Sequence, residues 1–133
     1  MLQKEFVPPQ ESSELKELGF NEPCIAWFAE TKELQIAPET YRKWTHKPCD
    51  NSNIVKVFNP DCFTAPIFSQ AFRFFRKMGL DQKIERESEG LHIGFYWNGV
   101  VWEQAGAGSY EEAELACLKK LIEIVKGGNN EHR

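Results

Sequence analysis

The 133-residue sequence lacks a long hydrophobic run, since no stretch approaches the roughly 18 consecutive apolar residues that a membrane-spanning helix requires. Residues 1–6 also lack the charged start and the apolar core of a signal peptide. Together these absences predict a soluble, cytoplasmic protein that does not act on a membrane.

Cations are not in excess, because sixteen Lys and Arg stand against twenty Asp and Glu, a formal net charge of −4. This balance excludes a generally basic nucleic-acid coat but leaves room for a local basic patch. Cysteine is scarce as well, and four residues are too few for a disulfide scaffold. Free thiols are therefore expected at Cys24, Cys49, Cys62 and Cys117.

The composition supports a folded core, since 41% of the residues are apolar and 27% are charged. We predict a single α+β domain over residues 1–126, in which an antiparallel sheet packs against two main helices, and a disordered tail over 127–133. Within this domain, an N-terminal part over 1–62 precedes an α-β-β-β-α core over 63–126. The expected elements of the N-terminal part are a helix over 8–18, a hairpin of strands 24–29 and 33–37, a long loop over 38–53 and a strand over 54–58.

Two amphipathic helices frame the expected core. Residues 65–78 place apolar side chains on one arc, Thr64 is the expected N-cap, and the opposite arc carries cations. Those cations are Arg73, Arg76 and Lys77. Ser109 and Glu112 form a capping box that predicts the start of the second helix, which should end at Lys126 before a glycine pair.

Three strands are expected between these helices, over 82–88, 91–97 and 100–104. Asn98-Gly99 predicts a two-residue hairpin loop, which places Trp97 opposite Val100 and Phe95 opposite Trp102. The predicted core face consists of Leu91, Ile93, Phe95, Trp97, Val100 and Trp102. The predicted outer face consists of His92, Gly94, Tyr96, Val101 and Glu103.

The order helix, three strands, helix over 64–126 resembles the double-stranded-RNA-binding domain, most closely at residues 98–102 and 106–114. In that family, lysines at the start of the last helix contact phosphates. The matching positions here hold Tyr110, Glu111 and Glu114, and carboxylates repel phosphate. The resemblance therefore implies a topology and no RNA-binding residue.

The whole chain also resembles small uncharacterised phage or prophage proteins of Bacteroides-type bacteria. Segments 15–24, 64–73 and 110–121 carry this resemblance. It implies an origin in a mobile element and no mechanism.

Residues 41–47 interleave three cations with two aromatic side chains. This composition is typical of a surface that contacts single-stranded nucleic acid or a phosphorylated ligand, although a solvated loop with Trp44 folded back would have it too. The cations of the first core helix would extend such a surface, or they belong to a solvated helix face. The candidate binding residues are Arg42, Lys43, Trp44, Lys47, Arg73, Arg76 and Lys77.

No metal, cofactor or catalytic set is predicted. His46, Cys49 and Cys62 would supply three metal ligands, but a structural zinc site needs four, usually in two close pairs. The outer-face trio of His92, Tyr96 and Glu103 offers acid–base groups without a nucleophile, and with Val101 the same surface would serve self-association.

The glycines of 106–108 precede a helix N-terminus, yet Glu111 and Glu112 occupy its first turn, so a tight turn is expected there instead of a phosphate site. From these observations we predict a small, non-enzymatic binding protein that acts by protein–protein contact, including self-association. The partner itself is not identified by the sequence. A nucleic-acid-binding module is the alternative, and an enzyme is the third hypothesis.

Overall fold

The computed structural model describes residues 5–29, 31–36 and 49–131. Within these residues the fold is α+β, as predicted, with four helices and two antiparallel sheets of three strands. The chain divides into two compact units, Met1–Gln70 (unit 1) and Ala71–Arg133 (unit 2). The predicted division between residues 62 and 63 lies upstream of this boundary. That both units belong to one domain stays a prediction.

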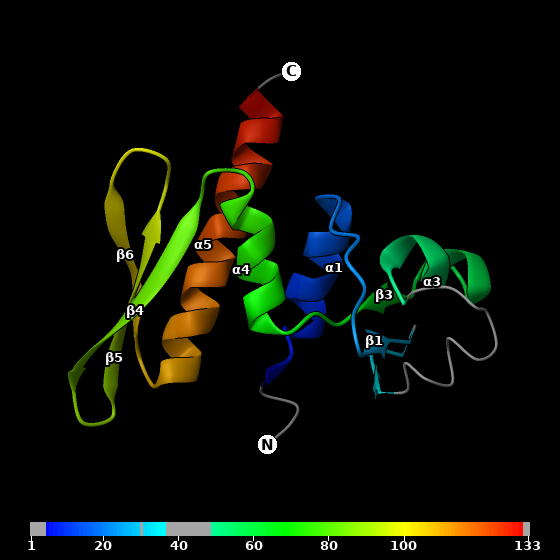
Figure 1. The fold of residues 1–133 in the computed structure, drawn as a ribbon, viewed down its shortest axis with the longest axis horizontal. Coiled ribbons are helices and arrows are strands. Elements are labelled where there is room, and N and C mark those ends of the chain that lie inside the picture. The colour runs from blue at the N-terminus through cyan, green and yellow to red at the C-terminus, as the bar shows by residue number, and fades with distance from the viewer. Residues whose placement is uncertain (1–4, 30, 37–48, 132–133) are drawn as a thin grey trace. The chain divides into compact units, whose positions relative to one another are not determined.

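Unit 1 contains short elements (Figure 1). They are α1 (Pro9–Glu17), β1 (Trp27–Phe28), β2 (Leu34–Gln35), α3 (Asn51–Val57), β3 (Phe63–Thr64) and the start of α4 (Phe68–Arg76). The sheet order is β2-β1-β3, and both pairings are antiparallel. The predicted N-terminal helix is confirmed as α1, and Gly19 follows it with a φ of 99° that favours glycine.

The strand predicted over 54–58 is wrong, because Asn51–Val57 form helix α3. The Asp50 carboxylate accepts a hydrogen bond from the Asn53 N–H at 2.9 Å and caps this helix. The helix buries Ile54 beside Cys49 and Cys62. A helix cap and one well-buried side chain therefore outweigh the alternating pattern that indicated a strand.

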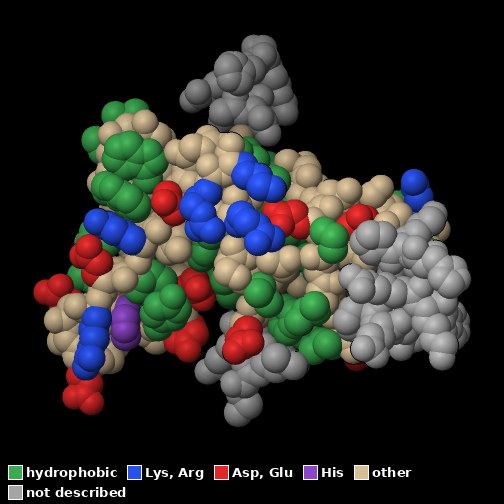
Figure 2. All heavy atoms as spheres, viewed as in Figure 1, with side chains coloured by type: hydrophobic (Ala, Val, Ile, Leu, Met, Phe, Trp, Pro, Cys, Tyr) green, Lys and Arg blue, Asp and Glu red, His purple; other side chains and the backbone are tan. Residues whose placement is uncertain are grey.

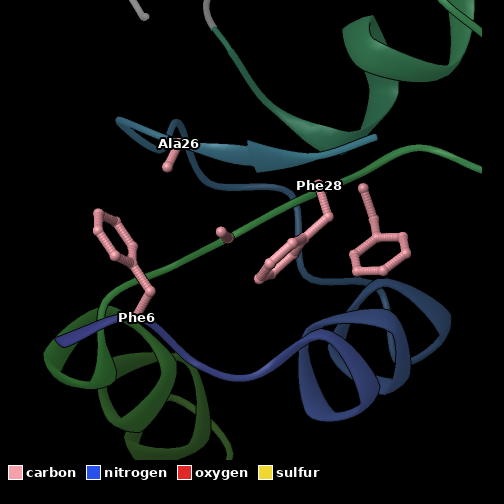
Figure 3. Packing of buried hydrophobic residues seen from close by; sticks show 5 residues of the cluster. Phe6, Ala26 and Phe28 are labelled. Atoms are coloured by element: carbon pink, nitrogen blue, oxygen red, sulfur yellow. The ribbon is translucent and has the colours of Figure 1, made fainter. Parts of the chain in front are cut away.

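Aromatic residues from three segments form the core of unit 1 (Figure 3). Phe6 precedes α1, Phe28 lies on β1 and Phe63 lies on β3, with Ala26 and Ala65 between them. The rings of Phe28 and Phe63 lie 5.5 Å apart between centroids. Segments distant in sequence are thus held together by burial of these side chains, and each phenylalanine contributes roughly 1.5–3 kcal/mol when fully buried.

Unit 2 begins with the rest of α4 and contains β4 (Asp81–Ser88), β5 (Leu91–Trp97), β6 (Trp102–Gly108) and α5 (Tyr110–Glu131). The sheet order is β4-β5-β6, with antiparallel neighbours. The predicted helix, three-strand and helix order is confirmed. The predicted N-cap Thr64 is wrong, because Thr64 pairs with Trp27 in the other sheet and α4 starts at Phe68.

Helix α5 does not end at Lys126, as predicted, but continues to Glu131. The predicted disordered tail is therefore helical over 127–131. Each glycine lowers helix stability by about 1 kcal/mol relative to alanine, but its backbone can still make helical hydrogen bonds.

The loop between β5 and β6 has four residues, 98–101, instead of the predicted two, because Trp97 pairs with Trp102 and Phe95 pairs with Gln104. The Asn98 side-chain oxygen accepts hydrogen bonds from Val100 N at 2.8 Å and from Val101 N at 2.9 Å. These bonds close a wider turn than a two-residue hairpin does. Because the register shift equals two residues, Phe95, Trp97 and Trp102 still share one face of the sheet.

Helix α5 packs against the face of the sheet that the sequence analysis assigned to solvent. A Cβ atom at Gly94 would lie 2.6 Å from the Ala113 carbonyl oxygen, and one at Gly106 would lie 2.7 Å from Cβ of Ala116. Both glycines therefore face α5. The predicted core face is the opposite one, and no helix among the described residues of unit 2 lies on it (Figure 1).

Candidate functional site

The face of the unit 2 sheet opposite α5 is a candidate binding surface, and we call it the open face. Its central residues are Lys83 of β4, Ile93, Phe95 and Trp97 of β5, and Trp102 of β6. They share a face because Lys83 pairs with Phe95 and Trp97 pairs with Trp102, and directly opposite residues in an antiparallel sheet point the same way.

Apolar side chains of the open face reach the solvent. Trp102 is 41% exposed and Leu91 at the start of β5 is 38% exposed, while Phe95 and Trp97 are half-buried. Val100 and Val101 in the adjoining loop are exposed as well. Figure 2 shows hydrophobic side chains gathered over the β5–β6 hairpin. Contiguous exposed apolar area of this kind marks interaction sites on soluble proteins.

The Lys83 side chain contacts two aromatic rings of the open face, those of Phe95 and Trp102. Its Nζ lies 4.6 Å from the ring centroid of Trp102 and 5.5 Å from that of Phe95. At exposed sites such a cation–π contact contributes about 0.5–1 kcal/mol. The same Nζ lies 3.4 Å from a carboxylate oxygen of Glu85. Lys83 therefore orients the rings while its charge is balanced by a neighbour.

Carboxylates alternate with this cation along β4. Asp81 pairs with Trp97 and Glu85 pairs with Ile93, so both point to the open face. Asp81 also lies 3.9 Å from the Arg76 guanidinium. The open face therefore has mixed charge along the edge strand β4 and apolar side chains along β5 and β6, and it is not a cationic surface.

The predicted basic surface is only partly described. Arg73, Arg76 and Lys77 are exposed, and Lys and Arg side chains gather over α4 in Figure 2. The other four predicted binding residues lie outside the described residues, so a surface that joins the two groups stays a prediction. These four are Arg42, Lys43, Trp44 and Lys47.

His92, Tyr96 and Glu103 lie on the helix side of the sheet, which corrects their predicted place on the outer face. Tyr96 pairs with Glu103 across the strands, and its hydroxyl donates to the Glu103 carboxylate at 3.2 Å. His92 lies four residues along β5, roughly 13 Å away at about 3.3 Å per residue. Its ring instead meets the edge of Tyr110, with centroids 5.7 Å apart.

This arrangement does not form an acid–base site. Burial and the hydrogen bond to Glu103 raise the pKa of Tyr96 above its ordinary value, so its phenol stays protonated. The Glu103 carboxylate also accepts a bond from the Asn98 side-chain amide at 2.6 Å. Tyr96 and Asn98 thus hold Glu103 at the base of the hairpin, which is a structural role.

The cysteines of unit 1 are buried together. Cys49 and Cys62 pack with Ile54, and the Cys24 N–H donates to the Cys49 carbonyl at 2.8 Å. Burial raises the pKa of Cys24 to about 12 and that of Cys49 to about 11, so both thiols are protonated at neutral pH. Within the described part of the chain, no three His, Cys, Asp or Glu side chains group as metal ligands. His46, the third predicted ligand, lies outside it.

Gly106 lies within β6, and Gly108 ends that strand with a φ of 145°, so only Ser109 connects the strand to α5 and the expected tight strand-to-helix turn is present. The predicted capping box of Ser109 and Glu112, which comes next along the chain, is confirmed. The Ser109 hydroxyl accepts from the Glu112 N–H at 3.1 Å, and the Glu112 carboxylate accepts from the Ser109 N–H at 2.9 Å. These two bonds hold the pKa of Glu112 below its usual range. A carboxylate therefore already occupies the start of α5.

The aromatic residues of the open face were predicted to share one face, but that face was predicted to be the core. Gly94 and Gly106 were the signal that points the other way, because glycine within a strand often marks close approach of another backbone. The small side chains of Ala113 and Ala116 on α5 match that signal.

No helix in the described ranges is long and apolar enough to cross a membrane. Comparison with known proteins identifies no relative: no protein-family model, curated protein or solved structure matches the chain. A function for this chain is therefore proposed from the geometry of its own residues.

Proposed function

We propose that this chain is a small, non-enzymatic protein-binding module whose binding surface is the open face of unit 2. The observation that carries the proposal is the row of half-buried Phe95 and Trp97 and exposed Trp102, on a sheet face that no described helix of unit 2 covers. Tryptophan is enriched among the residues that contribute most to protein–protein binding, because its large ring loses much water-exposed area on contact.

The charges around the open face favour a protein partner over a polyanion. Asp81 and Glu85 would lie close to a nucleic-acid backbone, and Lys83 is already balanced by Glu85. The formal net charge of −4 acts in the same direction. Mixed charges bordering an apolar centre are typical of protein–protein interfaces.

The proposal includes the cytoplasm as the place of action and a mobile element as the origin. The four free cysteines support a reducing compartment. The resemblance to phage-type proteins is the support for the origin.

A nucleic-acid-binding module is the second candidate, and the cations gathered over α4 in Figure 2 favour it. An enzyme has less support, because His92 lies far from the Tyr96–Glu103 pair.

The test compares proteins retained from a lysate by the immobilised chain and by a Trp102→Ala variant. Phe58→Ala is the matched control, because Phe58 in unit 1 is an aromatic residue of similar exposure. The proposal expects partners that the wild type and the control retain and that Trp102→Ala loses. Circular dichroism verifies that all three proteins are folded.

The same proteins are titrated with labelled single- and double-stranded DNA and RNA at two salt concentrations. Binding that weakens steeply with salt and is abolished in an Arg73→Glu/Lys77→Glu variant would replace the protein-binding proposal with the second candidate. Partner proteins that remain on Trp102→Ala would remove the open face from the proposal.

A further inference from the structure

We propose that the outer edge of β6 accepts an extended, basic peptide segment of a partner protein, which adds to the sheet as a fourth strand. This inference rests on the proposed function, since it names the kind of protein segment that unit 2 binds. Strand addition of this type gains affinity from main-chain hydrogen bonds and specificity from alternate side chains.

Strand β6 is at the edge of its sheet, because the strand order is β4-β5-β6. Six of its seven residues pair with β5 on one side, and a register shift leaves Ala105 out of the pairing. On the other side, no backbone of the described residues hydrogen-bonds to Trp102–Gly108. An edge of this length presents unpaired N–H and C=O groups to an incoming strand.

The two edges of the sheet differ in how well they are protected. Strand β4 carries Lys83, Glu85, Arg86 and Glu87, and charged side chains are a common protection against edge pairing. The second half of β6 has the sequence Ala-Gly-Ala-Gly over 105–108, with neither charge nor proline. Small side chains leave its backbone accessible, so β6 is the edge that can accept a strand.

The charge near β6 selects a basic peptide. From residue 98 to residue 118 the sequence contains four glutamates and no lysine or arginine, and Lys83 of β4, which lies over the Trp102 ring, is paired with Glu85. Glu103 lies at the start of β6 and is exposed. At the other end, a Cβ placed on Gly108 would lie 2.7 Å from the Glu112 carboxylate. Cationic side chains at both ends of an added strand would therefore meet carboxylates, and an acidic strand would be repelled.

The size of the open face also favours a peptide over a globular partner. Three strands of about seven residues cover roughly 23 by 14 Å, or about 330 Å², at ordinary strand dimensions. A standard interface buries about 800 Å² on each partner. A peptide compensates with hydrogen bonds to the edge, and its residue opposite Trp102 places an apolar side chain against that ring.

The experiment titrates the ¹⁵N-labelled full chain with a blocked peptide of alternating lysine and valine, eight residues long. Its matched controls are the same peptide with glutamate for lysine and the same peptide with a central proline, which prevents strand pairing. The proposal expects amide shifts and slower hydrogen exchange over 102–108 with the lysine peptide alone.

Two variants locate the contact. Ala107→Lys adds a cation to the β6 edge. It should weaken binding of the lysine peptide about fivefold or more, because the added cation repels the peptide and protects the edge from strand pairing. Ser88→Lys makes the same charge change on the β4 edge and should leave binding unchanged. The ¹⁵N spectra of both variants verify that the fold is retained.

Shifts confined to β4 or to unit 1, equal binding of the proline peptide, or no binding at millimolar peptide would overturn the edge proposal. If a captured partner is lost by Trp102→Ala but kept by Ala107→Lys, protein binding stands and strand addition fails. If Trp102→Ala loses no partner, the proposed function fails as well.

Discussion

Gly94 marks the closest approach of helix α5 to the unit 2 sheet. An added Cβ would lie 2.6 Å from the Ala113 carbonyl oxygen and 2.7 Å from the Cys117 sulfur. Backbone and a fully buried side chain form this contact, so neither can move aside without repacking the helix.

We therefore expect Gly94→Ala to reduce the free energy of unfolding by about 2–3 kcal/mol, in the range of overpacked cores. Gly127→Ala is the matched control, because no heavy atom lies within 4 Å of its added Cβ. This control should be neutral or stabilising by up to about 1 kcal/mol, since alanine favours helix. Urea unfolding measures both, and a Gly94→Ala variant as stable as the wild type would contradict the close contact.

Asn51 connects three segments of unit 1. Its buried side-chain amide donates to the Phe20 carbonyl at 2.7 Å, and its oxygen accepts from the Thr64 N–H at 2.8 Å. Truncation removes both hydrogen bonds, and a buried backbone group that loses its partner costs about 1–3 kcal/mol.

Asn51→Ala should therefore lower the free energy of unfolding by about 2–4 kcal/mol. The neighbouring Ser52→Ala is the control, because Ser52 is exposed and uses only its backbone N–H to bond Asn21. Thermal and urea unfolding of both variants test this expectation. Equal losses for the two variants would show that the bonds of Asn51 do not hold the segments.

At the scale of elements, the capping box at the start of α5 makes a contribution to the free energy of unfolding that depends on pH. The hydrogen bonds with Ser109 lower the pKa of Glu112 below its ordinary value of 4.5 in the folded protein. A carboxyl whose pKa is lower when folded stabilises the protein above its unfolded pKa. That contribution disappears as the pH falls through the folded pKa, which lies in the acid range below 4.5.

Glu112→Gln should consequently be less stable than the wild type near neutral pH and should approach it as the pH falls through the lowered folded pKa of Glu112, since both side chains are then neutral. Urea midpoints at several pH values measure the difference. Ser109→Ala, which removes the cap itself, should lower stability by about 1 kcal/mol near neutral pH. A difference between Glu112→Gln and the wild type that does not change with pH would exclude this carboxylate as its source.

Long elements with strong periodicity were predictable from sequence, and short ones were not. Helix α5 carries a capping box and many apolar residues at helical spacing, and its start was predicted correctly. Residues 54–58 alternate like a strand, yet the Asp50 cap and burial of Ile54 make them helical. Thr64 resembles a helix cap, but tertiary contacts place it in β3. A few local residues cannot outweigh contacts made by distant segments.

At the scale of the whole molecule, the single predicted domain requires units 1 and 2 to unfold together. The chain provides its own probes, because Cys24, Cys49 and Cys62 are buried in unit 1 and Cys117 is buried in unit 2. Buried thiols react with alkylating reagents only when their surroundings open.

Pulse alkylation across a urea series should label all four cysteines at one midpoint, coincident with the loss of circular dichroism. Mass spectrometry of the digested protein separates the peptides that contain them. Labelling of Cys117 at a different urea concentration from the other three would contradict a single cooperative domain and identify the units as independent.

The candidate site could be predicted in composition but not in orientation. Alternation along β5 and β6 correctly places Phe95, Trp97 and Trp102 on one face. Periodicity alone does not say which face of the sheet a helix covers. The aromatic face was predicted to be the covered one because it is the more apolar of the two. The deciding contacts lie between Gly94 or Gly106 and α5, where the absence of side chains allows close packing.

This packing has a consequence for how the sequence can change over evolution. The closest contacts of the sheet with α5 lie at Gly94 and Gly106, whereas Trp97 and Trp102 lie on the opposite face. Substitutions on the open face can therefore accumulate while Gly94 and Gly106 stay constant. Descendants of this sequence would then exchange one partner for another on an unchanged scaffold, as happens where recognition and folding depend on different residues.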